Sequence, residues 1–72
     1  MTEQEVYTAL QSIVNNAQER SLNWAVNYAK VGLGLSGDNL RVQCLYVLGN
    51  MTRWRGEEAK KVRNTLKEFT KR

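Results

Sequence analysis

The sequence predicts an all-α protein, a compact bundle of three or four helices. Apolar side chains recur every three or four residues along most of the chain, which is the spacing of helices that bury one side. The chain has no proline, and its five glycines fall at or near the ends of the periodic segments, where they mark turns. Seventy-two residues make one domain, residues 1–72, and a domain this small is only marginally stable as a monomer.

The first helix is predicted to start at Thr2. Thr2 and Glu5 have the spacing of a capping box, in which each side chain binds a free backbone N–H of the first turn. We favour a break near residues 19–21, where Ser21 can cap a new helix, because helices of about 30 residues are uncommon in small domains. One unbroken helix stays open as an alternative, because neither glycine nor proline interrupts residues 2–31. The apolar stripe of the first helix comprises Val6, Leu10, Ile13, Val14 and Ala17.

The next helix, which runs to about Val31, is apolar on two opposite sides. A helix on the outside of a small monomer needs only one apolar side, so this pattern predicts that neighbours cover the helix on both. At about 100° per residue, one stripe comprises Leu22, Ala25, Val26, Ala29 and Leu33, and the opposite stripe comprises Trp24, Tyr28, Val31 and Leu35.

A glycine-rich loop over residues 32–39 leads to a third helix, from about Asn39 to Met51. Glycine near the end of the preceding helix suits a left-handed cap, and Ser36 or Asp38 can cap the new helix. Like the second helix, the third is predicted to be buried on more than one side. Its main face comprises Leu40, Cys44, Val47, Leu48 and Met51, while Val42, Leu45 and Tyr46 extend apolar surface to the other side.

The last helix begins around residues 55–57 and is apolar on one side only. Glu57 and Glu58 lie in its first turn, and Lys71 and Arg72 lie at its end, which matches the helix dipole. Its apolar residues have a three-four-three spacing that is typical of contact with one neighbour. They are Ala59, Val62, Leu66 and Phe69.

Two helices with one apolar side each cannot hide two helices with two apolar sides. The sequence therefore predicts a homodimer, or an obligate partner, that buries a surface shared by the second and third helices. The residues expected at this interface are Trp24, Tyr28, Val31, Val42 and Tyr46.

The net charge of +4 is unevenly distributed. Residues 1–52 carry three basic and four acidic side chains, whereas residues 53–72 carry eight basic and three acidic ones. The basic C-terminal quarter favours an anionic partner, either an acidic protein or a nucleic acid. A solvated helix that keeps the protein soluble is the alternative. The cations concerned are Lys60, Arg63, Lys67 and Lys71, within an arc of about 80° on the last helix, and Arg53 and Arg55 just before it.

Trp54, between two arginines, has two interpretations. Its ring can stack on a nucleic-acid base while the arginines bind phosphates, or it can be the apolar plug of the corner between the last two helices. These helices loosely resemble a helix-turn-helix with a basic second helix. Glu57 and Glu58 lie where such a helix presents its base-reading side chains, so contact with the phosphate backbone is favoured over sequence reading.

The sequence predicts no enzyme, no cofactor and no metal site. It contains no histidine, so its hydroxyl groups lack the commonest base that activates a nucleophile. Gly32, Gly34 and Gly37 have the spacing of a dinucleotide-binding loop, but they follow a helix and not a strand, so we interpret them as a helix end and a turn. Cys44, the single cysteine, is expected to be a small core residue in a reducing compartment.

The sequence also predicts a cytoplasmic protein that does not cross a membrane. No apolar run approaches the length of a membrane span, about 20 residues. The first five residues are too polar and acidic for a secretion signal.

The chain as a whole is helical, free of histidine and rich in amides, and it ends in a basic helix. It includes the stretch Tyr46-Val-Leu-Gly-Asn-Met-Thr-Arg-Trp-Arg-Gly56. In this general character it resembles small accessory proteins encoded by bacteriophages and prophages. The resemblance implies a regulator, or an inhibitor of a host system, that acts in the host cytoplasm by binding alone.

We consider three functions. The first is a non-catalytic protein that self-associates and presents its basic helix to an acidic surface of a protein partner. The second is a DNA- or RNA-binding regulator that holds the phosphate backbone. The third is a purely structural oligomer whose charge serves solubility.

Overall fold

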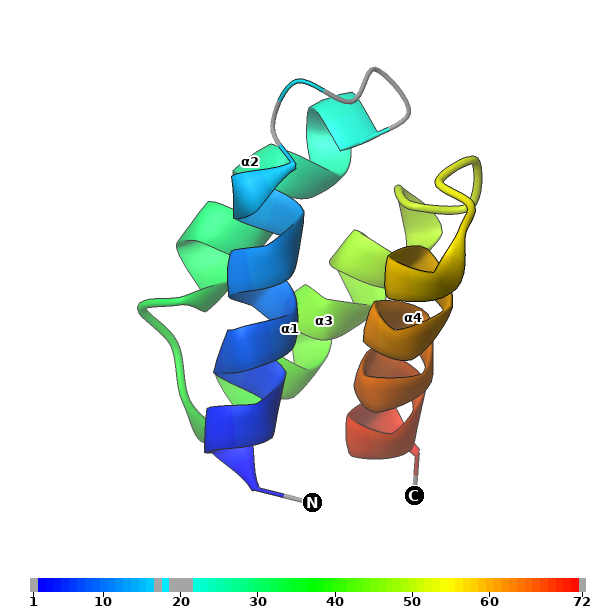
Figure 1. The fold of residues 1–72 in the computed structure, drawn as a ribbon. Helices are drawn as coiled ribbons and strands as arrows, with labels where there is room; N and C mark the ends of the chain where they lie inside the picture. The colour runs from blue at the N-terminus through cyan, green and yellow to red at the C-terminus, as the bar shows by residue number, and fades with distance from the viewer. Residues whose placement is uncertain (1, 17, 19–21, 72) are drawn as a thin grey trace.

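The computed structural model describes residues 2–16, 18 and 22–71, and it confirms the all-α fold class. Within these residues the chain forms four helices and no strand (Figure 1). The helices are α1 (Glu3–Asn15), α2 (Asn23–Gly32), α3 (Gly37–Gly49) and α4 (Glu57–Thr70).

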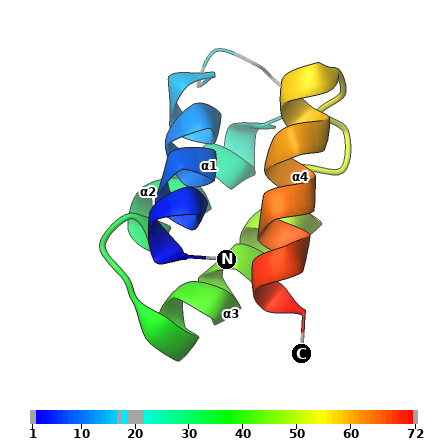
Figure 2. The same ribbon diagram turned by 60° about the horizontal axis from the view of Figure 1, so that its bottom comes forward.

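The four helices form a closed arrangement in which each packs on two others. Helix α1 packs on α2 and α4, and α3 also packs on α2 and α4. Helices α1 and α4 lie side by side and run in opposite directions, so the two ends of the chain lie at the same end of the bundle (Figures 1 and 2). One core occupies the space that the four helices enclose.

Most of the core residues belong to the predicted stripes; Ala9 and Trp54 are buried without having been assigned to one. Every helix contributes at least three buried apolar side chains, and no polar side chain is buried among the described residues. Val14, Leu33, Leu48 and Phe69 are partly buried at the edge of the core, while Ala17 lies outside the described residues. The buried set comprises Val6, Ala9, Leu10, Ile13, Leu22, Ala25, Val26, Ala29, Leu40, Cys44, Val47, Met51, Trp54, Ala59, Val62 and Leu66.

Helix α1 begins with the predicted capping box. The backbone N–H of Glu5 donates to Thr2 Oγ1 over 3.4 Å, and the backbone N–H of Thr2 donates to Glu5 Oε2, also over 3.4 Å. Helix α1 ends at Asn15 and α2 begins at Asn23, so the favoured break between two helices is confirmed. The break begins several residues before residues 19–21. These residues, with the proposed cap Ser21, lie outside the described part of the chain.

Helix α3 begins at Gly37, two residues before the predicted start. Ser36 occupies the N-cap position, but its side chain makes no capping hydrogen bond. The backbone N–H of Gly37 instead donates to Glu3 Oε2 over 2.8 Å. The hydroxyl of Tyr7 donates to the carbonyl oxygen of Leu35 in the same loop. The first turns of α1 therefore bind the loop that starts α3, across more than 25 residues of chain.

The left-handed glycine cap predicted at the end of α2 is not present. Leu33 occupies the C-cap position with right-handed helical angles (φ −63°, ψ −19°). Positive φ occurs instead at the starts of helices, at Gly37 (φ 59°) and at Gly56 (φ 118°). Gly32 is needed for a different reason. A Cβ at this position would lie 2.9 Å from Leu10 Cδ1, so the absence of a side chain lets α1 approach the end of α2.

Gly32 and Gly49 are each the last residue of their helix. Replacing each by alanine therefore compares a position where α1 is close with one where nothing is close. A Cβ at Gly49 meets nothing within 4 Å, and Gly49→Ala should raise the free energy of unfolding by about 0.5–1 kcal/mol because alanine favours the helix. At Gly32 the side chain of Leu10 must shift in a packed core. Gly32→Ala should therefore be less stable than Gly49→Ala by about 1–3 kcal/mol in urea denaturation. Equal stability of the two variants would contradict the contact.

Candidate functional site

The most distinctive surface of the protein is an exposed apolar face on α2 and α3. Five large apolar side chains expose between 41% and 63% of their surface. All five lie on these two neighbouring helices, with half-buried Tyr28 between them. We call this set the apolar face; it comprises Trp24, Tyr28, Val31, Val42, Leu45 and Tyr46.

A tyrosine pair joins the two helices across the apolar face. The rings of Tyr28 and Tyr46 stack with their centroids 5.8 Å apart and their planes at 23°. Beside the pair, Gln43 Nε2 donates a hydrogen bond of 2.9 Å to the carbonyl oxygen of Tyr28. These two contacts link the α2 and α3 parts of the apolar face at Tyr28.

All five residues predicted at a homodimer interface lie on the apolar face. Their role in self-association stays a prediction, because the structure holds a single chain. The predicted interface set omitted Leu45, although its exposed fraction of 47% exceeds the 41% of Val42. Leu45 is three residues after Val42, so the two lie on the same side of the helix. This spacing could have predicted that Leu45 is part of the face.

A second surface carries unpaired positive charge. Arg53 and Arg55 lie exposed in the connection between α3 and α4, and Lys60 and Lys67 are exposed on α4. Lys71 is also exposed, but it occupies the C-cap position just after the helix and not the helix itself. We call these five residues the cationic flank. In the described part of the chain none of them forms an ion pair; the pair of Arg41 with Asp38, 3.6 Å apart, lies on α3.

The structure corrects the prediction for Trp54 as a contact residue. Its side chain is only 6% exposed and belongs to the core at the α3–α4 corner, so the interpretation as an apolar plug is right and stacking on a base is wrong.

Arg63 is half-buried beneath this corner and is held by it. Its Nη2 donates to the carbonyl oxygens of Trp54 (2.8 Å) and Met51 (3.2 Å). The Met51 carbonyl also accepts from the backbone N–H of Trp54 (3.1 Å), so Arg63 adds a charged donor that ties α4 to the connection after α3. Arg63 was predicted to contact an anionic partner, but its Nη2 donates within the fold.

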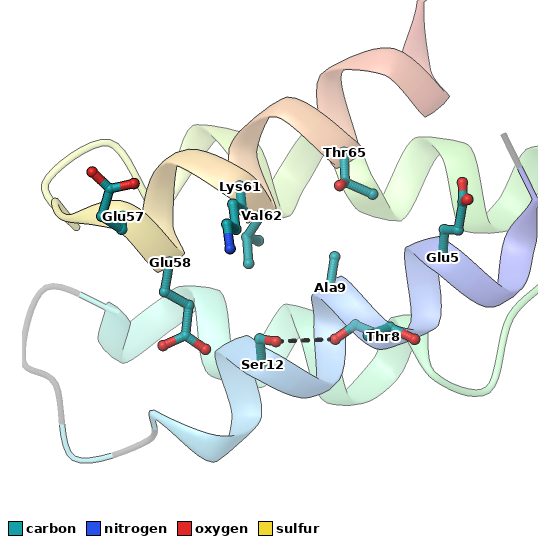
Figure 3. Close-up of a pocket in the computed structure, with 9 residues that line it drawn as sticks. All are labelled: Glu5, Thr8, Ala9, Ser12, Glu57, Glu58, Lys61, Val62 and Thr65. Atoms are coloured by element: carbon teal, nitrogen blue, oxygen red, sulfur yellow. Dashed lines mark hydrogen bonds between the residues drawn. The ribbon is translucent and has the colours of Figure 1, made fainter.

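The opposite side of α4 has the reverse charge character. A groove of about 520 Å³ runs between α1 and α4, with Glu5, Glu57 and Glu58 along it and Lys61 between them (Figure 3). Asn16 Nδ2 donates to Glu58 Oε1 over 3.2 Å at one end. Small residues such as Ala9 and Ser12 line the α1 wall. Helix α4 thus separates a cationic flank from an acidic groove.

The remaining chemistry of the described residues is sparse. Cys44 is fully buried, and burial raises the pKa of its thiol to about 11, so the sulfur stays protonated and shielded at neutral pH. Among the described residues no three His, Cys, Asp or Glu side chains come together as metal ligands. No helix in the described ranges is long and apolar enough to span a membrane.

The structural role of Arg63 can be tested against Lys60, its exposed neighbour on the same helix. Arg63→Ala should lower the free energy of unfolding by about 1–3 kcal/mol, because two carbonyl oxygens lose a charged donor. Lys60→Ala should change it by less than about 0.5 kcal/mol. Chemical denaturation of both variants measures the difference. An Arg63→Ala variant as stable as Lys60→Ala would show that the guanidinium is not needed at the corner.

Comparison with known proteins adds no relative on which to base a function. No protein-family model matches the chain, no curated protein is significantly similar to it, and no solved structure matches its fold significantly. The two surfaces therefore have to be interpreted from their own chemistry.

Proposed function

We propose that this chain is a small non-catalytic binding protein that acts by protein–protein association, and that the first partner of its apolar face is a second copy of itself. The observation that carries the proposal is the exposure of Trp24 (63%), Val31 (56%) and Tyr46 (54%) on one face of a 72-residue chain. Large apolar side chains in water are unfavourable, and a contiguous set marks an interaction surface.

The size of the apolar face fits the centre of an interface. Five half-exposed large side chains present on the order of 500 Å² of surface, near the upper limit for the largest apolar patch of an ordinary monomer. A stable interface buries about 800 Å² per partner, with an apolar core and a polar rim. Exposed Asn27 on α2 and Asn39 on α3 are available for such a rim.

A second copy satisfies the chemistry of the apolar face. In a two-fold dimer the same surface meets itself, so any charge on it would face a like charge across the axis. The six residues of the apolar face are all uncharged, and Tyr28 and Tyr46 are already ordered by stacking. Pairing two such faces would cover α2 and α3 on both sides, which is what their double apolar stripes require.

The acidic or nucleic-acid partner predicted for the basic region belongs to a different surface. The cationic flank lies around α4, and the apolar face lies on α2 and α3. Self-association would therefore leave α4 free for an anionic partner. This division suits the binding-only role that the resemblance to phage-encoded accessory proteins implies. A purely structural oligomer is the rival, distinguished by whether α4 binds anything.

Trp24→Asp tests the self-association directly. The wild-type chain should show the mass of two chains at high concentration, and the variant should dissociate with a constant about 30-fold larger or more, because replacing a central tryptophan typically removes 2 kcal/mol or more of binding energy. Sedimentation equilibrium measures both constants. Trp24 is exposed in the single chain, so the far-UV circular dichroism of the variant should equal that of the wild type.

Gln11→Asp is the matched control, since it adds the same charge at an exposed position on α1, away from the apolar face. This variant should dimerise like the wild type. A wild-type chain that stays monomeric at all concentrations, or a Trp24→Asp variant that still dimerises with the wild-type constant, would overturn the proposal.

A further inference from the structure

The cationic flank has a geometry that suggests its own ligand. Lys60 and Lys67 are seven residues apart on α4, which places them about 10 Å apart along the helix axis. Lys71 continues the row at one end of the helix, and Arg53 and Arg55 lie at the other. Helix α4 has 14 residues, so the row spans about 21 Å.

Contacts within the fold bring the arginine segment to the side of α4 that carries the lysines. Arg63 lies three residues after Lys60 and four before Lys67, so all three share one side of the helix. The hydrogen bonds of Arg63 to Met51 and Trp54 hold the connection against this same side. Arg63 is therefore the positioning residue that joins the two groups of cations.

We propose that the cationic flank binds the phosphate backbone of duplex nucleic acid without reading its sequence. Duplex DNA offers phosphates at 3.4 Å intervals of axial rise on each strand, so a row of about 21 Å passes several of them. Five exposed cations without a carboxylate partner in the described part of the chain match this dense negative charge. The proposal goes beyond self-association and does not depend on it.

The composition of the cationic flank favours nucleic acid over an acidic protein or a membrane. Protein interfaces are centred on buried apolar anchors, and helices that bind membrane surfaces insert an apolar side. The aromatic residues nearest to the cationic flank are not available as anchors, since Trp54 is buried and Phe69 packs against the core. A surface with charge and no exposed apolar anchor suits a polyanion.

The same burial favours a duplex over a single strand. Proteins that bind single strands stack the bases on exposed aromatic rings, and Trp54 is only 6% exposed. Exposed Trp24 and Tyr46 lie on the apolar face, on other helices. Glu57 and Glu58 line the groove toward α1. Exposed Glu68 adjoins Lys67 on α4 but forms no ion pair with the row among the described residues.

The test is fluorescence anisotropy of a short labelled DNA duplex of arbitrary sequence, titrated with the full chain at several salt concentrations. Five phosphate contacts predict a slope of log K against log salt of about −4 to −5. Lys60→Gln combined with Lys67→Gln should reduce the magnitude of this slope by about 2. The control combines Lys30→Gln with Lys61→Gln, which removes the same charge from α2 and from the groove side of α4. The control should keep the wild-type slope.

Four outcomes would overturn the proposal. They are no binding of the duplex at low salt, a control pair that reduces the slope as much as the test pair, tighter binding to the single strand of the same sequence, and tighter binding to vesicles of phosphatidylcholine and phosphatidylserine. Repeating the titration with Trp24→Asp separates this proposal from self-association, because the cationic flank is complete on one chain and its binding should persist in that variant.

Discussion

Each helix of this bundle has helical neighbours on one side only, and the rest of the structure depends on that constraint. Four short helices can enclose one core, and α2 and α3 each give one stripe to it. The described chain leaves most of their opposite stripes exposed, whereas Leu35, in the loop after α2, and Tyr28 are partly buried against the core. Their exposed residues consequently form the apolar face, in which the Tyr28–Tyr46 stack links the two helices. The hydrophobic effect then favours any association that removes this face from water.

The three surfaces of the bundle lie on different helices. The apolar face occupies α2 and α3, the cationic flank follows α4 and the connection before it, and the acidic groove lies between α4 and α1. The fold maintains this separation through two long-range ties. Glu3 and Tyr7 of α1 bind the start of α3 and its loop, and Arg63 of α4 binds the corner at the end of α3. Helix α3 is therefore fixed at both ends by neighbouring helices.

Features that depend on local periodicity can be predicted from the sequence. Features that depend on contacts between distant residues cannot. The helices, their buried stripes and the Thr2–Glu5 capping box follow from spacings of three and four residues, so they are confirmed. The start of α3 is shifted because its first N–H is bound by Glu3, 34 residues away in the sequence. Arg63 has the same charge as Lys60 and lies on the same side of α4, and only the folded corner shows that its Nη2 binds carbonyl oxygens of the chain. Trp24 and Tyr46 belong to the second apolar stripes of α2 and α3. Their exposure could be predicted once it was known that the other helices of one chain cover mainly the first stripe of each.

A dilution series of ¹⁵N–¹H correlation spectra of the wild-type chain tests the pairing of α2 and α3 with a second copy. If α2 and α3 pair with a second copy, the backbone signals around Val31, Val42 and Tyr46 and the indole signal of Trp24 should shift together with concentration. Signals from the exposed sides of α1 and α4 should stay constant. Spectra that do not change with concentration, or changes confined to α1 and α4, would contradict the central claim that the uncovered stripes of α2 and α3 form the interface.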